Sequence, residues 1–354
     1  MNTHPSPAKP APPGGLSTLN SSTEQATKNC VETEPDKDHY PNISRFQLMG
    51  RSTLSAIKPA YLFRPATLVR RVWIKFFPPH SPLQIVQLPW GSFIEIDANE
   101  VIGAAIFKQR IFDIAVSECA WRLLRAGDQV LDVGANIGYM TSLFAAKVGK
   151  QGSVFSFEPH PETRQKLAAN VTRFLDHGSV AKIVVYECAL GEVNGVADLI
   201  ETDDFATNRG SAFLADGAPI AHVAARRQVK VQPLDELIPT GEFGLLKIDV
   251  EGHELKVIQG ARQLLSQKRV RHIIYEDHMQ GKSGIPDILT SYGYKIYSIG
   301  HTLFGLKLMD LGKEIVLDTS WESPNYLATI DPAYVDSHIS NGWEILKGLN
   351  GNGN

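Results

Sequence analysis

Residues 127–161 read GDQVLDVGANIGYMTSLFAAKVGKQGSVFSFEPHP, and this stretch decides the fold. An apolar strand (129–134) leads into a short loop with two glycines, then a helix (139–149) and a second strand (153–159). Such a unit is typical of α/β proteins with a doubly wound parallel sheet, in which ligands bind beyond the carboxyl ends of the strands. The stretch therefore predicts a nucleotide-type binding site at the loop.

The same alternation continues along the chain to about residue 300. It predicts a mostly parallel sheet with helices on both faces. Strands are expected at 181–190, 243–250, 270–277 and 295–300, and helices at 161–176, 253–267 and 285–293. Upstream, residues 83–100 read as two short strands joined by a turn at 89–92, and residues 105–127 read as a helix that ends at Gly127.

The chain divides into four expected parts. Residues 1–42 are rich in Pro, Ser and Thr and are expected to form a disordered tail. Residues 43–120 are expected to form an extension, with a β-hairpin and a helix packing on the core. Residues 121–320 would form the main domain, and residues 321–354 a C-terminal extension with a frayed end. Within the main domain, the polar stretch 191–233 interrupts the alternation and is typical of a binding loop or lid.

Residues 68–77, LVRRVWIKFF, alternate basic and bulky apolar side chains. Such a segment can rest on a membrane surface or on a partner. The more ordinary explanation is a helix or strand that packs on the domain, and the sequence favours it.

Composition excludes several classes of protein. The 35 Lys and Arg residues against 38 Asp and Glu give a net charge of −3, so extensive nucleic-acid binding is not expected. Three cysteines argue against a disulfide framework and suit a reducing compartment. No run of eighteen apolar residues is present, so we expect no transmembrane segment and a cytoplasmic location. The oligomeric state is not predicted.

The loop after the first strand indicates the cofactor. Its glycines, Gly134 and Gly138, have Asn136 between them and lack the third glycine of a pyrophosphate-binding loop. Asp132, just before the loop, would repel a pyrophosphate and attract an ammonium group. Glu158 ends the next strand, where an acidic residue can accept hydrogen bonds from ribose hydroxyls.

Adenosine with a cationic tail describes S-adenosyl-L-methionine. After the third strand, Cys188 and Ala189 would lie beside the adenine. Each residue has an ordinary explanation by itself, as a turn glycine, a strand-end acid or a buried cysteine. The ordered set favours a cofactor site.

At this point the chain resembles the FkbM family of S-adenosylmethionine-dependent methyltransferases, from about Leu83 to Ile299. The matching segments are VLDVGANIGYMT (130–141), FSFEPHP (155–161), ECALGEVNG (187–195), PLDELI (233–238) and LLKIDVEGHELKVIQGA (245–261). The resemblance implies a Rossmann-like class I methyltransferase fold. It also implies O-methylation of a hydroxyl on a sugar, glycolipid or secondary metabolite, hence a small-molecule or glycan substrate.

The catalytic candidates are Asp249, Glu251 and His253, which lie at the end of the strand 243–250. A hydroxyl nucleophile benefits from a base, and Asp249 or His253 would take its proton while Glu251 positions the substrate hydroxyls or the methionine end of the cofactor. The alternative is that the two acids only cap the next helix and that His253 is a solvated first-turn residue. Lys247 is expected to form a structural ion pair with one of the acids.

The next strand ends in Glu276, Asp277 and His278, which would lie beside Asp249. This arrangement resembles the divalent-metal site of catechol-type O-methyltransferases. Because the chain lacks a clear Asp-Asn pair there, the sequence favours a polar rim without a metal.

Three rival functions remain open on the sequence. A methyltransferase acting on RNA or protein would need a basic face or a recognition domain. A nicotinamide oxidoreductase would need the missing third glycine. A non-catalytic protein could have kept only the cofactor pocket.

Overall fold

The computed structural model describes residues 79–347 except 177, 179, 206, 216–222 and 313–323, together with residues 59, 63 and 65–76. The predicted tail at 1–42 lies outside this part of the chain. Among the described helices, none is both long enough and apolar enough to cross a bilayer.

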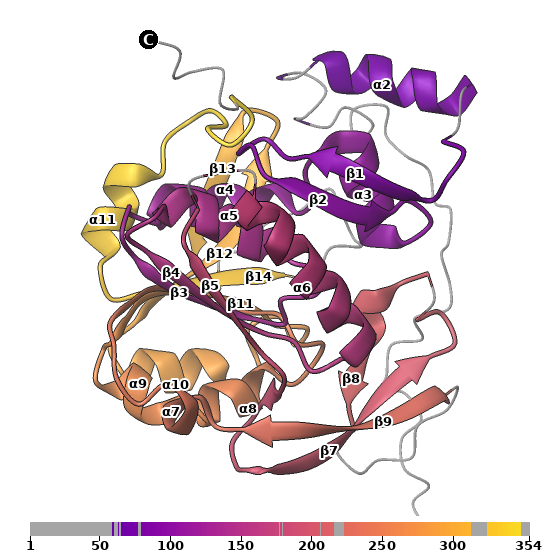
Figure 1. Ribbon diagram of the computed structural model, residues 1–354. Coiled ribbons are helices and arrows are strands. Elements are labelled where there is room, and N and C mark those ends of the chain that lie inside the picture. The colour runs from indigo at the N-terminus through magenta and orange to yellow at the C-terminus, as the bar shows by residue number, and fades with distance from the viewer. Residues whose placement is uncertain are drawn as a thin grey trace, which may run out of the picture. The chain divides into compact units, whose positions relative to one another are not determined.

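An eight-stranded sheet forms the centre of the domain (Figure 1). Its strands, in spatial order, are β13 (Gly305–Asp310), β12 (Lys295–Thr302), β14 (Asn325–Thr329), β11 (Val270–Glu276), β10 (Phe243–Ile248), β3 (Gln129–Val133), β4 (Ser153–Phe157) and β5 (Lys182–Tyr186). The five strands from β11 to β5 are parallel, whereas β14 is antiparallel to both of its neighbours and β13 to β12. This arrangement confirms the expected class I α/β fold.

The order of the strands reverses between β3 and β10. From β3 the chain moves outward through β4 to β5, and it then returns to β10 on the other side of β3. Ligands bind at such a switch point, beyond the carboxyl ends of the strands. Because β14 inserts between β11 and β12, the sheet continues past residue 320, where the sequence placed the end of the domain.

Helices cover both faces of the sheet (Figure 1). One face carries α4 (Ile114–Leu123), α5 (Tyr139–Val148) and α6 (Pro161–Asp176). The other carries α7 (Leu234–Leu237), α8 (Glu254–Gln259), α9 (Arg262–Ser266) and α10 (Ile285–Ser291), and α11 (Pro332–His338) packs near α4. Each face has its own apolar core, as expected when a parallel sheet is buried on both sides.

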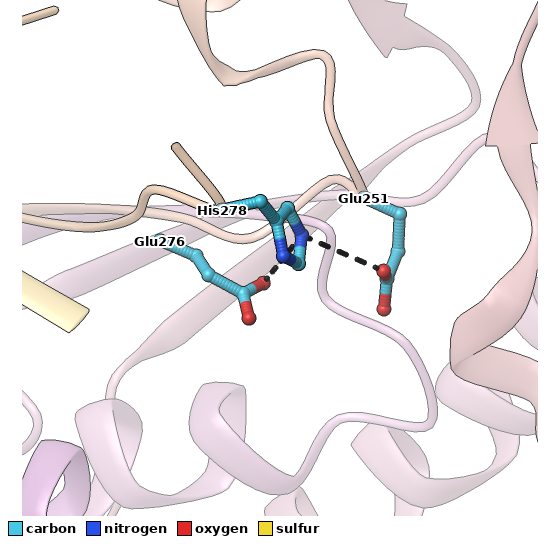
Figure 2. A group of neighbouring side chains, drawn as sticks. All are labelled: Glu251, Glu276 and His278. Carbon is cyan, nitrogen blue, oxygen red and sulfur yellow. Dashed lines mark ion pairs between the residues drawn. The ribbon is translucent and has the colours of Figure 1, made fainter. Parts of the chain in front are cut away.

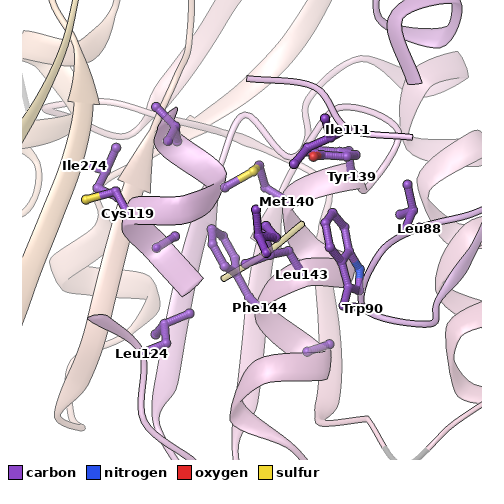
Figure 3. Packing of buried hydrophobic residues seen from close by; sticks show 14 of the residues in the cluster. Leu88, Trp90, Ile111, Cys119, Leu124, Tyr139, Met140, Leu143, Phe144 and Ile274 are labelled. Carbon is purple, nitrogen blue, oxygen red and sulfur yellow. The ribbon is translucent and has the colours of Figure 1, made fainter. Parts of the chain in front are cut away.

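The N-terminal hairpin is fixed to the first of these cores through its turn. β1 (Leu83–Gln87) and β2 (Phe93–Asp97) pair antiparallel, as predicted. Trp90 of the turn lies edge-on against Tyr139, with their ring centroids 5.3 Å apart, and its indole N–H donates to the Ser142 hydroxyl at 3.1 Å. Figure 3 shows Trp90 among the buried side chains of α5. A buried aromatic ring with its N–H satisfied anchors the hairpin to the domain.

The helix predicted at 105–127 is wrong in its bounds. The structure has α3 (Val101–Gln109) and α4, separated by a turn in which Arg110 and Asp113 adopt left-handed φ angles of 63° and 40°. The Asp113 carboxylate accepts a hydrogen bond from the Val116 N–H at 3.1 Å and so starts a new helix. α4 ends at Leu123, so Gly127 does not cap it.

The helix predicted at 253–267 is likewise two short helices, α8 and α9. The break lies at Gly260, where a Cβ atom would come within 1.9 Å of the Gly191 carbonyl oxygen. This close approach joins the end of α8 to the segment where the polar excursion begins.

The excursion 191–233, here called the lid, is more regular than the sequence suggested. β7 (Gly195–Thr202) and β9 (Val223–Gln232) pair antiparallel. β8 (Phe213–Leu214) and β6 (Ala189–Leu190) complete a four-stranded sheet, and the short 3-10 helix η1 spans Arg209–Ser211. The lid is thus a small sheet of its own rather than an irregular loop.

The basic, apolar segment near residue 70 forms the helix α2 (Pro65–Phe76). Ile74 packs against the core, and the Arg70 guanidinium donates to the Phe107 carbonyl at 3.1 Å. One side of α2 therefore packs on the domain, as the sequence favoured.

Candidate functional site

The predicted cofactor loop touches the end of β10. A Cβ atom on Gly134 would lie 1.8 Å from the Asp249 carbonyl oxygen, and φ at Gly134 is +74°. The Asp249 N–H donates to the Val133 carbonyl at 3.2 Å. Glycine is required here both by the left-handed conformation and by the neighbouring backbone. The loop and the predicted catalytic strand end therefore form one continuous surface.

Glu158 lies at the end of β4 with its carboxylate directed at this loop. One oxygen accepts from the Asn136 N–H and the other from the His160 N–H, both at 2.9 Å. Burial raises the pKa of Glu158 to about 7 despite these hydrogen bonds. Because each carboxylate oxygen has two lone pairs, both can still accept from ribose hydroxyls. The residue fits the cofactor role predicted for it.

Asp132 is fully buried beneath the loop. Its carboxylate accepts from the Thr141 hydroxyl at 2.6 Å and lies 3.6 Å from the Lys247 ammonium. Burial raises the pKa of Asp132, and Lys247 opposes that rise. The charge of Asp132 is thus already met inside the protein, and its contact with a cofactor stays a prediction.

Lys247 lies under the loop at the centre of the site. Its ammonium donates to the Gly134 carbonyl at 2.9 Å and lies 3.3 Å from an Asp249 oxygen. Burial lowers the pKa of Lys247, but Asp249 and Asp132 more than offset this and raise it overall. The expected structural ion pair is confirmed with Asp249, and Lys247 also pairs with Asp132.

Cys188 and Ala189 lie at the end of the third strand segment, and both are buried. Burial raises the pKa of the Cys188 thiol to about 11, so the side chain is a neutral apolar group. The neighbouring Phe157 and Tyr186 rings stack with centroids 4.8 Å apart. An apolar wall of this kind suits a purine, and the predicted adenine contact stays a prediction.

Three side chains that can bind a proton or a metal gather at the ends of β10 and β11: Glu251, Glu276 and His278. The His278 Nε2 atom lies 3.6 Å from a Glu276 oxygen and 3.9 Å from a Glu251 oxygen (Figure 2). One ligand atom from each residue lies within 4.8 Å of the others. We call this group the Glu–Glu–His cluster.

The electrostatics of the cluster are dominated by negative charge. Partial burial, followed by the Asp249 and Glu276 carboxylates, raises the pKa of Glu251 to about 9. The Glu251 side chain is 40% exposed, so solvent moderates this rise. The cluster can hold a proton, and its donor atoms can also accept a divalent cation.

The loop that carries Glu251 has an unusual backbone. Glu251 and Gly252 have φ angles of 51° and 90°. A single oxygen of the buried Glu254 accepts from both the Val250 N–H, at 3.2 Å, and the Gly252 N–H, at 3.1 Å. Glu254, rather than Asp249 or Glu251, therefore fixes the turn before α8.

His253 and Asp277 are not members of the Glu–Glu–His cluster. The His253 ring lies against Gly191, with its Nε2 atom 3.3 Å from the place of a Cβ there. Asp277 is buried and accepts from the Met279 and Gly281 N–H groups and the Ser283 hydroxyl, at 2.7–3.1 Å. Asp277 thus holds its own loop, and the catalytic role of His253 stays a prediction.

The lid reaches over the Glu–Glu–His cluster. A Cβ atom on Gly210 of η1 would lie 3.7 Å from a Glu251 carboxylate oxygen. The neighbouring Arg209 is bonded to Glu100 at 2.6 Å and to Glu162 at 3.3 Å. These pairs fix η1 to the start of α3 and to α6.

A second set of contacts joins the lid to the cofactor strand. The buried His160, two residues after Glu158, lies 3.1 Å from Glu201 of β7, and Arg227 of β9 is paired with the same carboxylate. Burial lowers the pKa of His160, which favours the neutral ring in this contact. Phe205 packs on the His160 ring at 4.7 Å. Through these contacts the lid is linked both to the segment that carries Glu158 and to the Glu–Glu–His cluster.

A hollow of about 570 Å³ also lies at the opposite edge of the sheet, among residues such as Asp128, Phe243 and Arg271. It lies at the amino ends of β3 and β10. Ligands of doubly wound sheets bind at the carboxyl ends, so we assign the functional site to the cluster and the cofactor loop.

Comparison with known proteins gives a family match for the domain. Residues 132–296 match the family model described as the methyltransferase FkbM domain. The match begins in β3, ends in β12 and contains the cofactor loop, the lid and the cluster. This part of the chain is therefore similar to a methyltransferase FkbM domain.

Two curated relatives match at similar identity. The hexuronic acid methyltransferase AglP of Haloferax volcanii is 28% identical over 176 residues, 48% of this chain and 65% of AglP. The 31-O-demethyl-FK506 methyltransferase FkbM of Streptomyces tacrolimicus is 28% identical over 253 residues, 63% of this chain and 93% of that protein.

Among solved structures, the methyltransferase FkbM from Methylobacillus flagellatus is 22% identical, with a TM-score of 0.38. The comparison covers 58% of this chain and 45% of that one. The chain thus spans less than two thirds of AglP and under half of this solved protein.

Sequence reasoning missed one residue of the site and one contact of two others. Glu254 is the last acid of the KIDVEGHE segment, and its spacing alone resembled an ordinary first-turn glutamate. Glu276 and His278 were predicted to lie beside Asp249 as a polar rim, which agrees with the pairing of Ile248 with Tyr275, and the structure also brings both residues to Glu251. The signal available was the parallel pairing of β10 with β11, which brings both strand ends to one edge.

Proposed function

We propose that the chain transfers a methyl group from S-adenosyl-L-methionine to a hydroxyl of a sugar or a secondary metabolite. The observation that carries this proposal is the contact of the Gly134 loop with the end of β10. It brings a cofactor-type loop and a proton-accepting cluster to one surface. The similarity to the FkbM domain and the two curated relatives, which by name act on a hexuronic acid and on 31-O-demethyl-FK506, support it.

The residues around the loop fit this cofactor. When bound, it supplies a methyl group on a positively charged sulfur, which a nucleophile can attack in line. Glu158 would accept hydrogen bonds from the ribose hydroxyls, and the Gly134–Gly138 loop would lie beside the cofactor. The buried wall at Cys188 and Ala189 would cover the adenine. Holding both reactants in line can lower the barrier by about 7–11 kcal/mol.

We assign the proton transfer to His278. Its ring lies between Glu276 and Glu251, at 3.6 and 3.9 Å, and a carboxylate that orients a histidine is the usual support for a general base. His278 would take the proton of the acceptor hydroxyl, and Glu276 would stabilise the charged ring. Asp249, which shares Lys247 with Asp132, would accept a hydrogen bond from the acceptor.

The chemistry of the site mouth suits a neutral, hydroxyl-rich acceptor. Asp249, Glu251 and Glu276 supply acceptor oxygens, and hydroxyl groups are the donors that pair with them without adding charge. The lid segment at Gly210 would lie against this acceptor and reduce the access of water. The nearby Arg209 is engaged by Glu100 and Glu162.

The test is incubation with methyl-labelled cofactor and separate acceptor panels: uronic and neutral sugars, macrolide-type metabolites, and RNA. We expect label in a hydroxyl compound, located by mass spectrometry, and none in RNA. Glu158→Gln, which keeps the size of the side chain, serves as the control and should strongly reduce labelling when the cofactor concentration is below its dissociation constant. Label in RNA, or tight cofactor binding without any labelled acceptor in a cell extract, would contradict the proposal.

A further inference from the structure

One side of α2 presents a row of apolar side chains to solvent. Val69, Val72, Trp73 and Phe76 recur at the spacing of one helical face, and their exposed fractions are 69, 52, 61 and 69%. The opposite side is already in use, since Ile74 packs on the core and Arg70 bonds to Phe107. α2 is therefore docked on the domain through one face and leaves a second apolar face outward.

Neighbouring elements add to this exposed apolar surface. Phe63, just before α2, is 42% exposed, and Leu83 and Ile85 on one face of β1 are 52 and 59% exposed. Seven large apolar side chains between residues 63 and 85 thus contact solvent. So many exposed large apolar side chains within a short part of the chain are typical of an interaction surface.

The distribution of basic residues in the sequence around α2 indicates which kind of partner this apolar surface would bind. Residues 39–94 contain seven basic residues, at 45, 51, 58, 64, 70, 71 and 75, and no Asp or Glu. The rest of the chain holds 28 basic and 38 acidic residues, a balance of −10. The basic charge is thus concentrated in the segment that carries the exposed apolar helix. A helix with Trp and Phe on one face, within a segment free of acids, fits an anionic bilayer surface.

We propose that α2 docks the protein on anionic lipid membranes, with Val69, Trp73 and their neighbours in the headgroup region. Twelve residues lying in the plane of the interface suit this geometry, and binding requires no crossing of the membrane. The inference is independent of the methyl-transfer proposal.

The test is flotation of the full chain with vesicles of phosphatidylcholine alone or mixed with phosphatidylserine. We expect binding only to the mixed vesicles, falling as salt is raised. Val69→Ser with Trp73→Ser should weaken binding about tenfold or more, since two exposed apolar groups are lost. Val193→Ser with Leu175→Ser is the matched control, because these side chains are 68 and 50% exposed on other elements, and it should bind normally.

A second measurement separates membrane contact from a folding defect. Trp73 is one of five tryptophans, so its transfer into the interface should shift the emission of the wild type to the blue on mixed vesicles. Trp73→Phe should keep vesicle binding and lose most of that shift. Equal binding to neutral vesicles, no binding by the wild type, or full binding by the Val69→Ser, Trp73→Ser variant would overturn the proposal.

Discussion

At the scale of single residues, Glu158 combines two opposed properties. It is buried, with a pKa raised to about 7, yet the proposed cofactor needs its ionised form. A carboxyl group whose folded pKa lies above its unfolded value holds its proton more tightly in the folded state. Its contribution to stability is therefore present below pH 4.5 and is lost as pH rises toward 7. At neutral pH and above, ionised Glu158 therefore lowers the stability of the empty protein, and the same ionised form would bind the cofactor.

We therefore expect Glu158→Gln to stabilise the empty protein and to weaken the cofactor site. At pH 8 the gain in unfolding free energy should be at most roughly 3 kcal/mol, from about 1.4 kcal/mol per pKa unit, and it should vanish below pH 4.5. The affinity for S-adenosylhomocysteine should fall about tenfold to a hundredfold. Thermal unfolding across pH and calorimetry measure the two effects. A variant that is less stable at pH 8, or that binds normally, would remove Glu158 from this role.

His278 allows a second prediction at the same scale. We expect His278→Gln to lower turnover by about 10²–10⁴-fold, the usual contribution of a general base. Cofactor affinity should stay unchanged, because His278 lies at the end of β11 beside Glu276 and Glu251, away from the Glu158 carboxylate. Single-turnover kinetics and calorimetry with S-adenosylhomocysteine separate the two quantities.

A chelator supplies the control for that experiment. The cluster has donor atoms within 4.8 Å that can also bind a divalent cation, whereas the sequence did not favour a metal. If the cluster moves a proton, the chelator should leave turnover unchanged. A loss of rate that Mg²⁺ restores would assign the cluster to a metal ion.

At the scale of elements, η1 lies against Glu251 beyond the end of β10, where we expect it to limit access to the cluster. An added Cβ at Gly210 would lie 3.4 Å from the Asn208 amide oxygen and 3.7 Å from Glu251. These are ordinary van der Waals distances, so an alanine side chain fits. A larger branched side chain would extend into the space proposed for the methyl acceptor.

We expect Gly210→Ala to act like the wild type and Gly210→Val to raise the KM for the acceptor about tenfold, with little change in cofactor affinity. Steady-state kinetics with each substrate varied in turn test this. An equal loss of affinity for the cofactor would show that η1 acts on the whole site instead of the acceptor side.

At the scale of the whole molecule, stability is divided between the two large cores and the lid. The central strands β3, β10 and β11 are buried on both faces, whereas the described residues of the lid sheet form a small cluster around Leu199 and Val229. Its contacts with the main domain include the His160–Glu201 hydrogen bond and the Arg209–Glu100 ion pair. Elements with few buried contacts open more readily than the core.

Hydrogen exchange should therefore be slowest in β3, β10 and β11 and faster in β7 and β9. Binding of S-adenosylhomocysteine should protect the Gly134 loop and, through His160 and Glu201, also β7. Exchange followed by mass spectrometry resolves these segments. Protection of the loop without any change in β7 would show that the lid and the cofactor site are not coupled.

The sequence by itself determined the parallel sheet, the hairpin and the family, because these depend on local patterns. Alternating apolar strands and helices, the spacing of Gly134 and Gly138, and the KIDVEG segment can all be read within short windows. The breaks at Arg110 and Gly260 could not be read in this way. They depend on a cap formed by Asp113 and on the backbone of Gly191, 69 residues before Gly260 in the chain.

Only the tertiary structure decided which polar side chains meet. Lys247 joins Asp132 to Asp249, and Glu251 faces His278 rather than His253. Such pairings depend on the order of the strands and on the direction in which each side chain leaves its strand end. The reversal of strand order between β3 and β10 brings residues that are far apart in the sequence to one edge of the sheet. No local sequence pattern encodes which residues meet there.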